Sequence, residues 1–184
     1  MSQRWHLPPG RRARLLLLVA ASAVAGVAAV SIALGLGGGA GARPQPARNF
    51  TVPVLGHPGQ QLSLSRYAGK PVIVNFFASW CTPCQHETPL LARFYRGSHG
   101  RLAMIGIDVN DPAGAAMAFV RKTGVSYPIG VDAAPMPTAA AYSVNGLPQT
   151  FFLNAQHQIV KRVFGAVTRQ QLTTGTALID PGTK

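Results

Sequence analysis

Two cysteines, Cys81 and Cys84, are the only ones among the 184 residues of the chain, and two residues separate them. Disulfides are attacked by thiolates, whereas a free cysteine has a pKa of about 8.5 and is mostly protonated at neutral pH. At the first turn of a helix, unpaired N–H groups and the positive end of the helix dipole would stabilise the Cys81 thiolate. Cys84 would lie on the same face, close enough to form a disulfide. The pair therefore predicts thiol–disulfide exchange in which Cys81 attacks and Cys84 resolves the mixed disulfide.

Other uses of two cysteines fit the sequence less well. A disulfide framework in a small secreted protein has four or more cysteines, and a closed structural zinc site takes four ligands. We therefore expect neither a bound metal ion nor an organic cofactor. Incidental buried cysteines are the remaining alternative. The position of residues 80–84, between a strand pattern and a helix pattern, argues against it.

The elements that position the cysteines flank them directly. Residues 71–77 form a nearly continuous apolar, β-branched and aromatic run, which is typical of a strand buried on both faces of a sheet. From residue 82 to about residue 96, apolar side chains recur at helical spacing, and Pro83 suits the first turn of a helix. We therefore expect a strand, the cysteine motif and a helix in immediate succession.

Beyond this unit, strand patterns alternate with helix patterns, which predicts a layered α/β domain. Asp111 and Pro112 have the types expected of an N-cap and a first-turn proline, and Thr168 is a candidate N-cap for the last helix. The expected elements are an N-terminal hairpin (50–55 and 61–64), a strand (102–107), a helix (111–122), a short strand (129–131), a brief helix (137–142), a second hairpin (149–153 and 159–164) and a final helix (168–178).

A long apolar segment precedes the predicted domain. Residues 15–36 contain only Leu, Val, Ala, Ile, Gly and Ser, and at about 1.5 Å per residue they reach across a hydrocarbon core of about 30 Å. Arg11, Arg12 and Arg14 stand directly before this segment, so the positive-inside rule keeps the N-terminus in the cytoplasm. The alternatives are a signal peptide cleaved near the small residues 40–42 and a twin-arginine export signal. Each of these routes places the cysteines outside the cytoplasm.

Composition divides the chain into four parts. We expect a basic cytoplasmic N-terminus (1–14), a transmembrane signal anchor or export signal (15–36), a flexible linker rich in Gly, Ala and Pro (37–48) and one folded domain (49–184). The formal net charge is +12, but six of the seventeen basic residues precede Asn49, and no basic run is interleaved with aromatic residues. This distribution argues against nucleic acid as a partner.

Residues 74–84, which read Val-Asn-Phe-Phe-Ala-Ser-Trp-Cys-Thr-Pro-Cys, resemble the active-site strand and helix of thioredoxins. Other residues resemble the membrane-tethered TlpA-like branch of this superfamily, which includes the reductases of cytochrome c maturation. These residues are Glu87, Pro89, residues 127–128 and residues 146–151. The resemblance covers roughly residues 47–180. It implies a thioredoxin fold, in which helices flank a central mixed sheet, with an N-terminal hairpin and an inserted helix and strand over residues 111–132.

The resemblance also implies roles for three residues near the cysteines. Pro148 would be a cis-proline facing the cysteine pair, as cis bonds are almost confined to X-Pro. The backbone of Leu147 would then be free to pair with an extended substrate. Trp80 would cover the sulfur atoms and form part of the docking surface.

One position departs from the thioredoxin pattern. Thioredoxins usually carry a buried acid that assists proton transfer where this chain has Asn75, and an amide cannot titrate. Glu87, the only glutamate in the chain, follows Cys84 by three residues. Because burial would raise its pKa, we expect Glu87 to act as the proton acceptor for Cys84.

The resemblance implies a reductant that acts outside the cytoplasm on apocytochrome c or on related thiol proteins. A membrane electron donor would then restore the Cys81 and Cys84 thiols. An oxidant, a thiol peroxidase with the same fold and a copper chaperone that uses both thiols are the alternatives.

Overall fold

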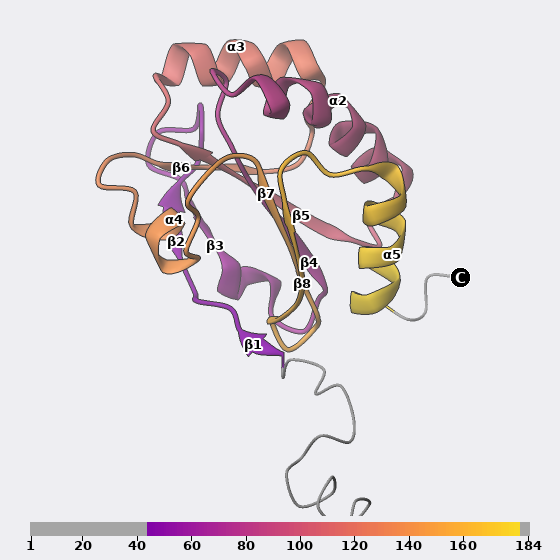
Figure 1. Cartoon of the computed structure of the whole chain (residues 1–184). Coiled ribbons are helices and arrows are strands. Elements are labelled where there is room, and N and C mark those ends of the chain that lie inside the picture. The colour runs from indigo at the N-terminus through magenta and orange to yellow at the C-terminus, as the bar shows by residue number, and fades with distance from the viewer. Residues whose placement is uncertain (1–43, 181–184) are drawn as a thin grey trace, which may run out of the picture. The chain divides into compact units, whose positions relative to one another are not determined.

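A six-stranded mixed sheet lies at the centre of residues 44–180, the part of the chain that the computed structural model describes (Figure 1). The strand order is β1-β8-β7-β4-β5-β6, and β2 and β3 form a separate antiparallel hairpin. The strands are β1 (Gln45–Pro46), β2 (Thr51–Pro53), β3 (Gln61–Ser63), β4 (Val72–Phe77), β5 (Ala103–Val109), β6 (Ile129–Asp132), β7 (Gln149–Leu153) and β8 (Gln158–Phe164). The helices are η1 (Leu64–Tyr67, a 3-10 helix), α2 (Thr82–Gly97), α3 (Ala113–Thr123), α4 (Pro137–Ala141) and α5 (Arg169–Ile179).

Strand β4 is a central strand of the sheet, and all six of its residues are buried. It pairs in parallel with β5 and antiparallel with β7. A strand covered on both faces needs apolar residues at successive positions, which explains the continuous run in the sequence. The predicted strand is therefore confirmed, and it ends four residues before Cys81.

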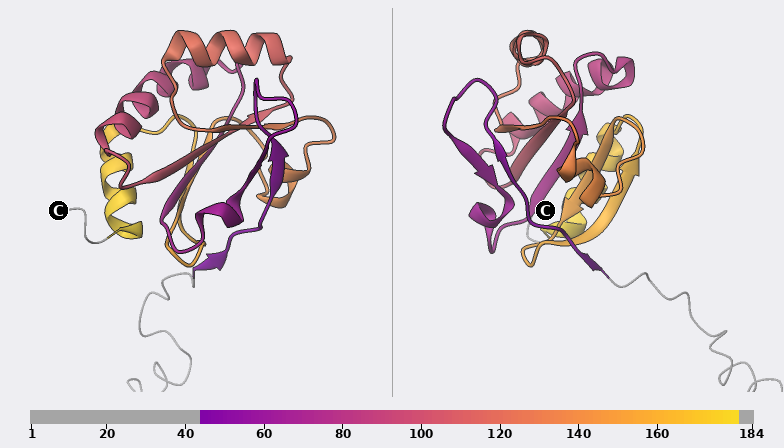
Figure 2. Two further views of the ribbon diagram at one scale, coloured as in Figure 1. Left: turned by 180° about the vertical axis from the view of Figure 1, so that it is seen from behind. Right: turned by 90° about the vertical axis from the view of Figure 1, so that its left-hand side faces the viewer.

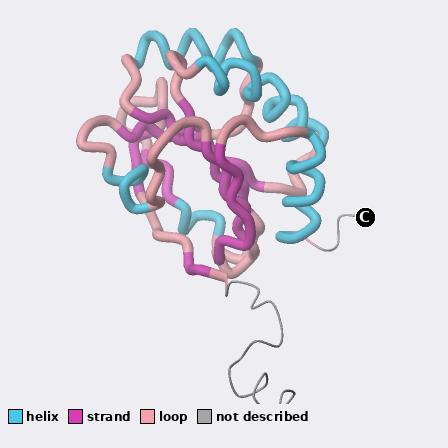
Figure 3. The backbone as a smooth tube through the Cα atoms, viewed as in Figure 1, coloured by secondary structure: helices cyan, strands magenta, loops and turns pink. Residues whose placement is uncertain are grey.

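Side chains of β4 alternate between two hydrophobic clusters, as the strand period requires. Ile73 and Phe77 pack in the cluster that includes residues of α2, α3 and α5, whereas Val72, Val74 and Phe76 pack in the cluster with the β2–β3 hairpin and α4. In both views of Figure 2, α2 and α5 lie away from the β2–β3 hairpin, whereas α3 lies close to the hairpin loop. Figure 3 shows the helices surrounding the strands. The layered α/β architecture is thus the predicted thioredoxin fold, including the hairpin and the inserted α3 and β6.

Helix α3 begins differently from the prediction. Its N-cap is Pro112 in an extended conformation, with no side-chain cap, and the helix starts at Ala113. The carboxylate of Asp111 instead accepts hydrogen bonds from the backbone and the hydroxyl of Ser79. The predicted cap was wrong because Ser79 binds the side chain that would have formed the cap.

The folded part also begins earlier than residue 49. Strand β1 pairs with β8, with Gln45 opposite Ile159, and the Tyr142 hydroxyl donates to the carbonyl of Arg48. Residues 44–48 therefore belong to the domain and not to a linker. The compact unit begins at Pro44.

The predicted N-terminus (1–14), apolar segment (15–36) and most of the predicted linker (37–43) lie outside the described residues. Within residues 44–180, none of the helices has the length and apolar character that a membrane span requires.

Helix α5 begins with a reciprocal capping box that we expect to stabilise the domain measurably. The Thr168 hydroxyl accepts the N–H of Gln171, and the Gln171 side chain accepts the N–H of Thr168. Thr168→Ala should lower the free energy of unfolding by about 1 kcal/mol, measured by denaturant titration, and Thr168→Ser should restore most of the loss. Thr173→Ala, an exposed change in the same helix, should stay within about 0.5 kcal/mol of the parent. Equal effects at both positions would contradict this role for the cap.

Candidate active site

A disulfide joins Cys81 to Cys84 at the start of α2, with 5.2 Å between their Cα atoms. Cys81 is the N-cap residue of this helix, and its Sγ accepts the N–H of Cys84 at 3.3 Å. Pro83 occupies the first turn, where its missing N–H leaves no hydrogen bond unmade. The predicted succession of strand, cysteine motif and helix is confirmed, and it directs the helix N–H groups at the Cys81 sulfur.

The two sulfur-bearing side chains differ in accessibility. Cys81 is 6% exposed, whereas Cys84 is completely buried. Cys81 therefore has some surface that a partner molecule can contact, while Cys84 has none.

Glu87 lies one turn after Cys84, and its side chain is only 3% exposed. Its carboxylate accepts two hydrogen bonds, from Asn75 Nδ2 at 2.9 Å and from the N–H of Val167 at 2.6 Å. Burial raises the pKa of Glu87 to about 7, although both hydrogen bonds act in the opposite direction. Glu87 therefore has the burial predicted for it, and its pKa suits proton exchange near neutral pH.

Asn75 lies in β4 at the position where the resemblance implied an acid. Its Nδ2 group donates to Glu87 and also to the Thr150 hydroxyl, at 3.0 Å, on the adjacent strand β7. Its Oδ1 atom is buried and has no partner. Asn75 thus holds the carboxyl group of Glu87 in place, a role that the sequence did not indicate.

The loop residues Leu147 and Pro148 are joined by a cis peptide bond, as expected. Pro148 is buried and Leu147 is half-buried. Trp80 is 60% exposed, and its Nε1 donates to the carbonyl of Asn110 at 3.3 Å. A groove of about 300 Å³ extends between Trp80 and Leu147, and its other lining residues are Val109, Asn110, Pro135, Met136, Ala139, Ala140, Val144 and Gly146. The predicted substrate-binding residues therefore line one mostly apolar groove.

Hydrogen bonds hold the segment that precedes Cys81, and the sequence did not predict them. Asp111 binds Ser79, as described above, and Gln85 Nε2 donates to the Ser79 carbonyl at 2.7 Å. Asp108, near the end of β5, is a second residue that the sequence analysis missed, and it is fully buried. An acid inside an apolar strand pattern was the available signal.

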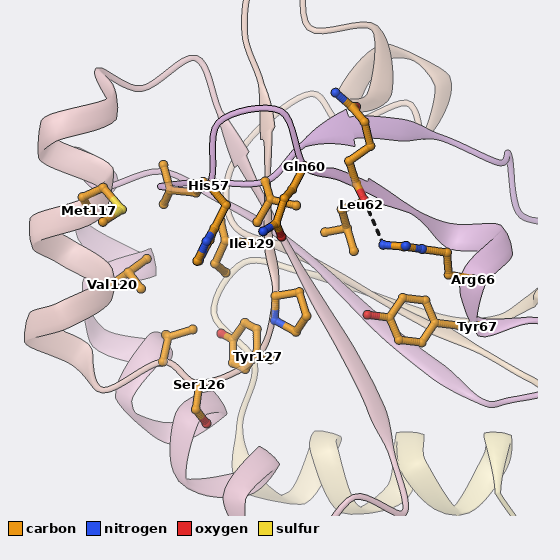
Figure 4. Close-up of a pocket in the computed structure, with 15 residues that line it drawn as sticks. His57, Gln60, Leu62, Arg66, Tyr67, Met117, Val120, Ser126, Tyr127 and Ile129 are labelled. Atoms are coloured by element: carbon orange, nitrogen blue, oxygen red, sulfur yellow. Dashed lines mark hydrogen bonds between the residues drawn. The ribbon is translucent and has the colours of Figure 1, made fainter.

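A second cavity, of about 480 Å³, lies between the β2–β3 hairpin, α3 and the segment before β6 (Figure 4). Polar side chains at its rim include His57 and Arg66, and Arg66 donates to the carbonyl of Gln61. None of the residues predicted for the active site lines this cavity. Among residues 44–180, no group of three or more His, Cys, Asp and Glu side chains is arranged to hold a metal ion.

Comparison with known proteins points to the same chemistry. Residues 44–162 match the model of the AhpC/TSA family. The thiol-disulfide oxidoreductase ResA of Bacillus subtilis is 32% identical over 125 residues, which are 67% of this chain and 69% of that protein. ResA of Halalkalibacterium halodurans is 31% identical over 67% of this chain and 70% of its own length.

Solved structures agree with these relatives. A DsbF homologue from Corynebacterium diphtheriae has a TM-score of 0.67 and 26% identity, covering 74% of this chain and 87% of its own. A secreted Mycobacterium tuberculosis disulfide oxidoreductase homologous to DsbE has a TM-score of 0.63 and 25% identity, and the match covers 70% of this chain and 95% of that one. The buried cysteine pair at a helix start, the fold and these relatives together show that the chain belongs to the AhpC/TSA family and is a thiol-disulfide oxidoreductase.

Proposed function

We propose that this protein reduces disulfides of exported proteins and that Cys81 is the attacking thiol. The observation that carries the proposal is the position of Cys81 Sγ at the N-cap of α2, where it accepts the N–H of Cys84. After reduction, the same N–H group and the helix dipole stabilise a thiolate at Cys81. Cys84, completely buried, is suited to the second step and not to the first.

The proposed cycle moves two electrons from the cysteine pair to the substrate. The Cys81 thiolate attacks one sulfur of the substrate disulfide, which forms a mixed disulfide and releases the other substrate sulfur as a thiolate. Cys84 then loses its proton and attacks Cys81 Sγ, so that the second substrate sulfur leaves and the Cys81–Cys84 disulfide forms. Glu87 accepts the Cys84 proton, since it lies one helical turn away and is held by Asn75 and Val167.

In this proposal the groove beside the disulfide binds the substrate chain. Exposed Trp80 supplies an apolar surface on one side of the groove, and Leu147, on the other, offers backbone groups to an extended segment. Pro148, buried behind Leu147, fixes the direction of that backbone.

We further propose that the protein works outside the cytoplasm, anchored through residues 15–36, and that apocytochrome c or a similar exported thiol protein is the substrate. The basic and apolar pattern of the N-terminal segment supports this location, and one structural relative is described as secreted. The resemblance to the reductases of cytochrome c maturation supports the substrate and the reducing direction. A membrane electron donor would then return the disulfide to two thiols.

A thiol peroxidase is the second candidate, because the matching family model bears the name AhpC/TSA. Peroxide reduction by the purified thiol form, followed with hydrogen peroxide and compared with reduction of a protein disulfide, separates the two activities. Peroxide turnover faster than disulfide reduction would favour the peroxidase. A stoichiometric copper complex at neutral pH would instead favour the copper chaperone.

Trapping the intermediate tests which cysteine attacks. Cys84→Ser leaves Cys81 as the only thiol, so the mixed disulfide cannot be resolved and should accumulate as a covalent adduct on a non-reducing gel. Cys81→Ser is the matched control, and we expect about tenfold less adduct because Cys84 is buried. More adduct with Cys81→Ser than with Cys84→Ser would reverse the assignment.

Glu87→Gln tests the proton acceptor. The amide keeps the shape of the side chain but cannot take the Cys84 proton, so the rate of mixed-disulfide resolution should fall by about 100-fold, measured by quenched-flow trapping. The first step does not involve Cys84. In the Cys84→Ser background, adduct formation should therefore change by no more than about twofold with Glu87→Gln. An unchanged resolution rate would remove Glu87 from the mechanism.

The same substitution has an equilibrium signature in the oxidised protein, in which neither cysteine titrates. The pKa of Glu87 is raised to about 7 in the folded chain, so its contribution to stability is complete below the unfolded pKa of about 4.3 and is lost as the pH rises to about 7. Denaturant titrations across this window should show the free energy of unfolding falling with pH, by about 3 kcal/mol from this group. Glu87→Gln should make the decline shallower, and an equally steep decline would contradict the raised pKa.

A further inference from the structure

Asp108 is a buried carboxyl group that the proposed mechanism does not use. It lies near the carboxyl end of β5, opposite Phe77 in β4, and has no exposed surface. Neither of its oxygen atoms has a hydrogen-bond donor in the described residues. A carboxylate without donors in such a place is costly, so the group needs either a proton or a partner that shares one.

Asp111 is the neighbour whose side chain interacts with Asp108. It is half-buried, and its own oxygen atoms accept the Ser79 N–H at 2.5 Å and the Ser79 hydroxyl at 2.9 Å. Because Ser79 donates to both oxygen atoms of Asp111, Asp111 has the acceptor role in the pair. Asp108 can then donate a hydrogen bond to Asp111 only when it carries a proton.

The Asp108–Asp111 pair acts on the segment that leads to Cys81. Ser79 is held by Asp111 and also by Gln85, while Trp80 donates to the carbonyl of Asn110, next to Asp111. The loop after β5 is therefore fastened to the two residues that precede the attacking cysteine. A change of charge in the pair reaches Cys81 through this contact and through space.

We propose that Asp108 and Asp111 share one proton and that this proton positions the Ser79–Trp80 segment and limits the negative charge near Cys81. Asp108 is thus a positioning residue for the redox reaction. When the proton leaves, two carboxylates face each other beside the segment, and the added negative charge disfavours the Cys81 thiolate. The inference rests on the proposed role of Cys81 as the attacking thiol.

The other ionisable groups nearby are already engaged. Glu87 of α2 is bound to Asn75 and Val167, and Asp132 at the end of β6 accepts the N–H groups of Thr138 and Ala139 in α4. Burial is the main cause that raises the pKa of Asp108 to about 7, with the charge and hydrogen bond of Asp111 adding to it. The transition therefore falls in the range where the enzyme would work.

Alkylation of Cys81 by iodoacetamide, measured from pH 5 to pH 9, tests the proposal in the full chain with Cys84→Ser as the parent. Asp108→Asn mimics the protonated acid because its amide can donate to Asp111. At pH 5.5 we expect Cys81 to be alkylated at the same rate in the parent and in Asp108→Asn. Above pH 7 we expect Asp108→Asn to react up to about threefold faster than the parent, because it lacks the negative charge that Asp108 gains when its proton leaves. Asp132→Asn, which changes a buried carboxyl facing α4, should superimpose on the parent at every pH.

A purely structural role predicts a different result, in which Asp108→Asn changes the rate by one constant factor at all pH values. That outcome, or superimposable profiles, would overturn the proposal. If Asp108→Asn does not fold, as judged by near-UV circular dichroism, Asp111→Asn provides the second test. It removes the like charge, so above pH 7 its Cys81 should be alkylated faster than that of the parent. Failure of Cys81 to react in the parent would instead count against the proposed function.

Discussion

The hydrogen bonds to the Glu87 carboxyl group are the interaction on which the arrangement of the site depends. They join α2, which begins after Cys81 and contains Cys84, to Asn75 in the central strand and to Val167 just before α5. A carboxyl group that is almost completely buried needs such donors. The same donors stabilise its charged form, while burial stabilises the neutral form. Glu87 therefore both connects these three elements through hydrogen bonds and titrates near neutral pH.

A second acidic group holds the other side of the site. Asp111 fixes Ser79 immediately before the cysteine motif, and Asn110 accepts the indole N–H of Trp80. Hydrogen bonds therefore join the segment before Cys81 to the loop after β5. Both cysteines border the hydrophobic core next to α2, α3 and α5, but Cys84 is completely buried whereas Cys81 keeps 6% of its surface exposed. This asymmetry gives the two sulfur atoms their different surroundings although only two residues separate them.

Local patterns predicted the strand, the cysteine motif and the helix because these elements are contiguous and their burial follows directly from residue type. Glu87 was predictable for the same reason, since it follows Cys84 by one turn of the same helix. The contact of Asp111 was not, because its partner Ser79 lies 32 residues earlier in the chain. The pairing of Gln45 with Ile159 was missed because a two-residue strand has no recognisable alternation and depends on a partner more than a hundred residues away.

The short strand β1 also determines the direction from which the chain enters the domain. β1 pairs with the beginning of β8, next to the turn after β7, whereas Phe76, Gln149 and Phe164 pair at the other end of the same strands, where the cysteine motif begins. In Figure 1, β1 accordingly lies at the bottom of the sheet, far from the start of α2. A solid support or a fluorescent protein attached directly before Pro44 would therefore lie at the end of the sheet opposite the disulfide. Immobilisation through the N-terminal side of the domain would leave the end that carries Cys81 and Cys84 accessible to large partners.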